Sequence, residues 1–191
     1  MKKLFLLTLV AVFGFTAGHT QEDPEKLIKK AMKAYNAFNL EQTAKSASLD
    51  EAKTIIDGVF QSEAMNSNVA ALLAKGSIYS GFLTRDQTQK LLNPDFKSTI
   101  NFPAAFIAYE AYSKALGLAQ KKFEKSDALK GLQSLTGALN NAGNDMYNAN
   151  KFEDAYNNFS ASLAIHDKVK AAGEVSALDK PEDYNNQLFI V

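Results

Sequence analysis

The sequence predicts an all-α fold made of antiparallel helical hairpins, and three features lead to this prediction. After residue 23 the chain is rich in alanine, leucine, lysine and glutamate, which favour helices, and the whole chain has only 4 prolines. It contains no run of alternating β-branched residues of the kind that strands favour. Apolar residues instead recur at helical spacing through several successive segments, which is typical of helices that bury one face.

Residues 1–20 have the pattern of a secretory signal peptide. Two lysines precede a continuous apolar run at 4–15, and small residues follow it at Ala17 and Gly18. The run is shorter than the roughly 20 residues that a membrane-spanning helix needs, and no later segment is as continuously apolar. The sequence therefore predicts an exported bacterial protein, in the periplasm or secreted, with no membrane span in the mature chain.

Charge and composition narrow the class of function. Without Lys2 and Lys3, 19 basic residues stand against 21 acidic ones, a net charge of −2 that gives no electrostatic footprint for nucleic acid or an anionic membrane. The chain has no cysteine, so it has no disulfide and no thiolate metal site. A chain without cysteine fits a bacterial periplasm at least as well as a eukaryotic secretory route.

The sequence offers little for catalysis. Its 2 histidines are His19, beside the signal peptide, and His166, which falls near the end of a predicted helix where a cation is favourable. No His-x-x-x-His, Cys-x-x-Cys, P-loop or Gly-x-Gly-x-x-Gly motif occurs. We therefore expect no enzymatic activity, no cofactor and no metal site.

The predicted helices pair into three hairpins, at about 24–65, 69–120 and 127–172, within one helical repeat domain of residues 21–191. The individual helices are expected at 24–38, from Ser48 to about 60, and at 69–83, 102–119, 127–148 and 151–172. Ser48 has the spacing of a capping box with an acidic residue three positions on. The insertion at 85–101 is expected to hold a short helix near 88–92, because long loops without structure are uncommon in compact domains.

Residues 181–191 are expected to begin a further helix, with Asp179 as its cap and with Tyr184 and Leu188 facing inward. An array of hairpins normally ends in a helix with a polar outer face. The apolar end of this chain is therefore expected either to be half of a seventh helix from a longer parent protein or to pair with another chain, which would allow self-association.

Two helical patterns face each other across a very tight turn at 139–167, and the order of residue sizes there is specific. Gly143 precedes the larger Met146 by three positions, Ala155 follows Gly143 by twelve, and Phe159 comes four further on. This order resembles the hairpin of the tetratricopeptide repeat (TPR) family. Gly143 is interpreted as a packing glycine, whereas the two glycines at six-residue spacing before it have no role that the sequence explains.

Weaker copies of this pattern precede it in the chain. In all three hairpins a small residue stands four positions before a larger apolar one, at Ala52 and Ile56, Ala108 and Tyr112, and Ala155 and Phe159. The three alanines are 56 and 47 residues apart, whereas the family repeats about every 34 residues. Extra residues between the copies account for the difference.

The resemblance implies a right-handed superhelical array whose first helices line a concave channel that takes up segments of other proteins. The residues expected to bind a partner there are Asn140, Asn144, Tyr147 and Asn148 in the last hairpin and Lys26, Lys29 and Lys33 in the first. Asparagine amides both donate and accept hydrogen bonds and could hold a peptide backbone, and a lysine row could hold an acidic segment. The expected function is a non-enzymatic scaffold or adaptor for protein–protein interactions in the bacterial cell envelope.

The alternative is a periplasmic small-molecule or glycan-binding subunit in which tyrosines line a pocket between helices. The tyrosines in question are Tyr79, Tyr109, Tyr112 and Tyr147. Their spacings mostly point into the core, where a tyrosine ring also packs well. An open trough would favour the scaffold, and a closed cavity with converging hydroxyls would favour the binding subunit.

Overall fold

The computed structural model describes residues 22–190, and helices dominate this part of the chain. It has seven α-helices and one 3₁₀ helix, and no strand occurs between residues 22 and 190. The helices are α1 (Pro24–Leu40), α2 (Ser46–Val59), η1 (Glu63–Ser67), α3 (Val69–Leu92), α4 (Ala104–Leu118), α5 (Lys122–Asn148), α6 (Phe152–Ala171) and α7 (Pro181–Ile190). The predicted all-α fold is confirmed, whereas the predicted signal peptide, 1–20, lies outside the described residues.

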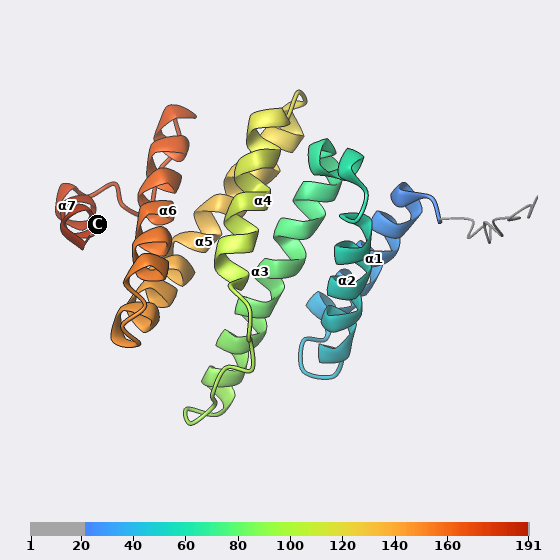
Figure 1. Ribbon diagram of the computed structural model, residues 1–191, viewed down its shortest axis with the longest axis horizontal. Helices are drawn as coiled ribbons and strands as arrows, with labels where there is room; N and C mark the ends of the chain where they lie inside the picture. Colours follow the sequence, from blue (N-terminus) through green and yellow to red (C-terminus); the bar gives the residue numbers. More distant parts are fainter. Residues whose placement is uncertain (1–21, 191) are drawn as a thin grey trace, which may run out of the picture.

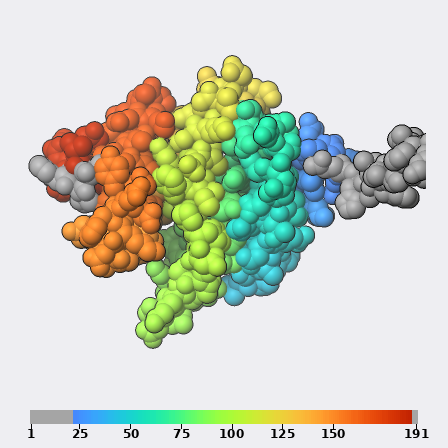
Figure 2. Space-filling view, viewed as in Figure 1, coloured from blue at the N-terminus to red at the C-terminus, as the bar shows by residue number. Residues whose placement is uncertain are grey.

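The helices form two layers. Consecutive helices pack as the pairs α1 with α2, α3 with α4 and α5 with α6, and α3 also contacts α1 and α5. Figure 1 shows α2, α4 and α6 in the front layer, and α1, α3 and α5 behind them. The space-filling view in Figure 2 places α1 and α7 at opposite ends of the long axis, where α7 packs against α6.

The three alanines in register are all buried, which allows the two helices of each pair to approach closely. Ala52, Ala108 and Ala155 are each at most 2% exposed. In the second pair, a Cβ on Gly76 would come within 2.7 Å of the Tyr112 ring, and in the third pair a Cβ on Gly143 would come within 2.5 Å of Phe159. The same contact between a glycine and an aromatic ring therefore recurs, and Gly143 is confirmed as a packing glycine.

Two helix boundaries differ from the predicted ones at their starts. Helix α2 begins at Ser46, and the N–H of Ser48 donates to the carbonyl of Lys45 at 3.0 Å, so Ser48 lies inside the first turn and the predicted capping box is wrong. Helix α5 begins at Lys122, five residues before the predicted start. There the Glu124 carboxylate accepts the backbone N–H of Lys121 at 3.2 Å, and this hydrogen bond lowers the pKa of Glu124.

Helix α3 continues through the predicted short helix at 88–92 instead of stopping near residue 83. Contacts with the first pair hold this extension in place. Arg85 forms an ion pair with Asp50 of α2 at 3.2 Å, and the Thr88 hydroxyl donates to the Gln42 side chain at 2.7 Å. The helix ends at Leu92, before Pro94, as the restriction that proline places on the preceding residue requires.

The C-terminal part also differs in detail from the prediction. Asp179 does not cap α7 but forms an ion pair with Lys170 of α6 at 3.1 Å. Leu188 is 53% exposed, so the prediction that it faces inward is wrong, whereas Gln187 is buried. Tyr184 packs on the His166 ring of α6, with 4.8 Å between the ring centroids.

Candidate protein-binding groove

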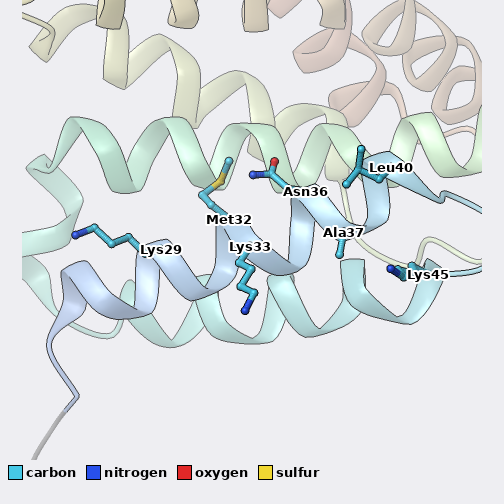
Figure 3. Close-up of a pocket in the computed structure, with 7 residues that line it drawn as sticks. All are labelled: Lys29, Met32, Lys33, Asn36, Ala37, Leu40 and Lys45. Atoms are coloured by element: carbon cyan, nitrogen blue, oxygen red, sulfur yellow. The ribbon is translucent and has the colours of Figure 1, made fainter.

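A groove of about 490 Å³ runs along the exposed flank of α1. Its lining residues are Lys29, Met32, Lys33, Asn36, Ala37, Leu40 and Lys45. Six of the seven residues belong to α1, and Lys45 immediately precedes α2. Figure 3 shows α1 in the foreground with α2 and α3 behind it, so the groove opens on the outer side of the first helix pair.

Both apolar and cationic side chains line this groove because α1 is amphipathic. Ile28 and Phe38 are buried and fix one face of α1 against the core, which leaves the opposite face in solvent. On the open side, Met32 and Ala37 are half-buried and Leu40 is 83% exposed. An exposed leucine beside half-buried apolar residues is a surface that a partner side chain could cover.

Three of the residues that line the groove are lysines. Lys29 and Lys33 are exposed on α1, and neither forms an ion pair with another described residue. Lys45 forms an ion pair with Glu41 at 3.1 Å at the far end of the groove. The arrangement offers two free ammonium groups and an apolar floor, which suits an acidic segment that also carries large apolar side chains.

The predicted lysine row lies only partly in the groove. Lys29 and Lys33 line it, whereas Lys26 is exposed one turn earlier on α1 and is not among the lining residues. The groove also contains Leu40, which lies beyond the end predicted for the first helix. A predicted helix that continued to residue 40 would have placed Leu40 on the same flank as Lys33, because residues seven positions apart lie on one face of a helix.

The predicted asparagines lie on α5 and do not join this groove. Asn144, Tyr147 and Asn148 are exposed, and Asn140 is half-buried with an Oδ1 atom that accepts no hydrogen bond from the described residues. The Tyr147 ring packs on Phe152 across the α5–α6 turn, with 5.5 Å between the ring centroids. Helix α3 lies between α1 and α5 (Figure 1), so the lysine row and the asparagine row are separate surfaces.

The four tyrosines take part in separate contacts. Tyr79 is buried, and its hydroxyl donates to Asp57 of α2 at 2.8 Å; burial and then this carboxylate raise the pKa of Tyr79. Tyr112 is buried and its hydroxyl is hydrogen-bonded to that of Ser77 at 3.1 Å. Tyr109 packs on Phe106, and neither this tyrosine nor Tyr147 lines the α1 groove.

A second hollow, of about 230 Å³, lies between the first and second helix pairs. Its lining residues are Phe60, Asn66, Leu72, Lys75, Ile107, Glu110, Ala111 and Lys114. Lys75 stands over the Phe60 ring, with its Nζ 4.4 Å from the ring centroid. Glu110 balances one of its two lysines, so this hollow has a weaker charge preference than the α1 groove.

No helix between residues 22 and 190 is long and apolar enough to cross a bilayer. Comparisons with protein-family models, with curated proteins and with solved structures found no match for this chain. The α1 groove and the repeated packing of the helix pairs are therefore the features from which a function can be inferred.

Proposed function

We propose that this chain is an exported, non-enzymatic, TPR-like scaffold of the bacterial cell envelope that binds an acidic segment of another protein. The α1 groove is the observation that carries the proposal. It combines an apolar strip ending at Leu40 with the ammonium groups of Lys29 and Lys33, which form no ion pair with another described residue.

The repeated helix packing supports the TPR-like part of the proposal. Gly76 meets Tyr112 in the second pair, and Gly143 meets Phe159 in the third pair. Equivalent contacts in successive pairs are what a repeat architecture needs, because each unit buries its apolar face against the next. The stacking of α1, α3 and α5 in one layer is compatible with the superhelical array that the family resemblance implies.

The two kinds of side chain in the groove would contribute differently to binding. Covering one large apolar side chain completely is worth about 1.5–3 kcal/mol. An exposed ion pair is worth only about 0.2–1 kcal/mol, and salt screens it. Apolar burial over Met32, Ala37 and Leu40 would therefore supply most of the affinity, and the lysines would select acidic partners and orient them.

Peptide selection tests this function without knowledge of the partner. A display library of random 15-residue peptides is selected on the purified protein, and the recovered peptides are expected to be rich in Asp and Glu together with Leu, Ile, Phe or Met. Their dissociation constants are then measured by fluorescence anisotropy. The variant Lys29→Glu/Lys33→Glu should weaken binding at least about tenfold, since it reverses both free charges in the groove.

A matched control separates the groove from net charge. Lys125→Glu/Lys130→Glu makes the same charge change on exposed residues of α5. It should leave binding of the selected peptides within about twofold of the wild type, because surface charges at a distance are screened. Equal weakening by both variants, or no acidic enrichment in the selection, would contradict the proposed function.

Export is tested separately by mass spectrometry. The protein is produced in a bacterial host with its full N-terminus, and the envelope fraction is collected. Cleavage after Ala17, Gly18 or Thr20 is expected, because small residues follow the apolar run there. Recovery of the uncleaved chain from the cytoplasm alone would contradict the proposed location.

A further inference from the structure

We propose that the α1 groove of one copy binds α7 of a second copy, so that this chain associates head to tail. The inference rests on the proposed function of the groove as a protein-binding site, and it names the occupant of that site. The contact is heterologous, because two different surfaces meet, and it therefore builds open chains or rings rather than closed twofold dimers.

The positions of the two helices favour a contact between copies. Helix α1 is at one end of the array and α7 is at the other, as Figures 1 and 2 show. Helix α7 packs against α6 on its inner side, where Tyr184 and Gln187 are covered. Its outer side remains in solvent, too far from α1 of the same chain to fill the groove.

The two surfaces carry opposite charge. Helix α1 contains four lysines and one glutamate, and none of its lysines, at 26, 29, 30 and 33, forms an ion pair with another described residue. The segment 174–190 has four acidic residues and one lysine, and Glu182 and Asp183 in the first turn of α7 are exposed. Residues 22–190 as a whole, α1 included, carry a net charge of −2, so the basic character of α1 is local.

The apolar groups and the spacing also correspond. Leu40 is 83% exposed at one end of the groove, and Leu188 is 53% exposed near the end of α7. At 1.5 Å per residue, Lys33 lies about 10 Å from Leu40 along α1, and Asp183 lies about 8 Å from Leu188 along α7. Along the helix axes, a parallel arrangement therefore brings the acidic first turn of α7 to the level of Lys29 and Lys33, and it brings Leu188, which lies on a different flank of α7 from Asp183, to the level of the apolar strip.

A helix of this length covers a small area, so the association is expected to be weak. Interfaces below about 1,200 Å² are typical of transient complexes. Sedimentation velocity of the purified wild-type protein should show a monomer at micromolar concentration, and its average sedimentation coefficient should rise as the concentration approaches the millimolar range. Salt should shift the association to higher concentration, because the charged groups are exposed.

Two charge-reversed variants and their mixture test the contact. The groove variant is Lys29→Glu/Lys33→Glu, and the α7 variant is Glu182→Lys/Asp183→Lys. The average sedimentation coefficient of each variant alone should no longer rise with concentration, because its groove and its α7 then carry charges of the same sign. In an equimolar mixture the sedimentation coefficient should again rise with concentration, because α7 of the groove variant is acidic and the groove of the α7 variant is basic.

The mixture gives a result even where reversing the first turn of α7 melts that helix, because the groove variant keeps its own α7 intact. A wild-type protein that remains monomeric up to the millimolar range overturns the inference, as does a mixture that fails to associate. A monomeric wild type that binds the selected acidic peptides would overturn self-association and leave the proposed function in place. Self-association without peptide binding would instead contradict the broader partner-binding function.

Discussion

The ring of Tyr112 on α4 packs against the backbone of Gly131 on α5, so that no side chain can stand at position 131 while the ring keeps its place. A Cβ there would come within 2.5 Å of Tyr112 Cε1. The same ring fills the space above Gly76 of α3, and it is only 6% exposed. One tyrosine thus joins the second helix pair to the third, and the glycines on either side give it room.

Gly131→Ala should therefore destabilise the protein, although alanine is the better helix former. Overpacking against a buried ring costs about 1–3 kcal/mol, which exceeds the gain of about 0.5–1 kcal/mol from replacing a helical glycine. Urea denaturation followed by circular dichroism measures the free energy of unfolding. Gly137→Ala is the control, because Gly137 is exposed and nothing lies within 4 Å of its added Cβ, so this variant should gain stability. A stabilised Gly131→Ala variant would contradict the packing described here.

Gly143→Ala should be destabilising for the same reason, because its Cβ would come within 2.5 Å of Phe159 Cε1. The further change Phe159→Leu removes the ring that the new methyl group meets. The double variant should therefore lose less stability than the two single variants together, with a coupling of about 0.5–3 kcal/mol for residues in contact. Additive losses in the same urea experiment would show that the two residues do not share this space.

Alkaline pH should weaken the fold through Tyr79. Burial and then the hydrogen bond to Asp57 raise the pKa of this tyrosine in the folded protein. An unfolded tyrosine ionises near pH 10, so the folded state holds its proton more tightly above that pH. The contribution of Tyr79 to the free energy of unfolding is therefore fully present below about pH 10, and it is lost as the pH rises towards the raised pKa of the folded state. Tyr79→Phe should show a smaller fall in the free energy of unfolding between pH 9 and pH 11 than the wild type, and an identical fall would contradict this role.

Acid should loosen the docking of α7 on α6. Although partial desolvation opposes its ionisation, the hydrogen bond from Lys170 and a backbone hydrogen bond with Ser176 lower the pKa of Asp179. The contribution of Asp179 to stability is therefore present above about pH 3.9, the pKa of an aspartate in the unfolded chain, and it is lost as the pH falls through the lower pKa of the folded state. Protection of the segment 176–190 from hydrogen exchange, corrected for the pH dependence of the intrinsic exchange rate, should fall in acid. Lys170→Ala should already show faster exchange there at neutral pH, while exchange in α3 stays unchanged.

Sequence reasoning succeeded where the relevant contact lies within one pair of helices. Gly143 and Phe159 are separated by a tight turn, so the order of small and large residues along the chain was enough to place them together. The contact of Gly131 with Tyr112 joins two pairs, and its register depends on how the pairs stack, which local spacing does not determine. The extension of α3 beyond residue 83 was not predicted for a similar reason, because it depends on the ion pair of Arg85 with Asp50 of another helix.

The candidate site was predictable to the same extent. The helical face of Lys29 and Lys33 could be read from the spacing of the first helix, and both residues line the groove. Leu40 was missed because the helix was expected to end earlier, and its 83% exposure is a property of the folded chain. The asparagines of α5 could be placed on an exposed face, but their separation from α1 follows from the position of α3.

The most direct test of the groove as a protein-binding site is a nuclear magnetic resonance titration. The ¹H–¹⁵N spectrum of the protein is recorded while an acidic, leucine-containing peptide from the selection is added. We predict that the amide shifts concentrate at Lys29, Met32, Lys33, Asn36, Ala37, Leu40 and Lys45. Shifts concentrated on α5 around Asn144 and Tyr147, or spread without preference over the surface, would contradict the assignment of the α1 groove as the binding site.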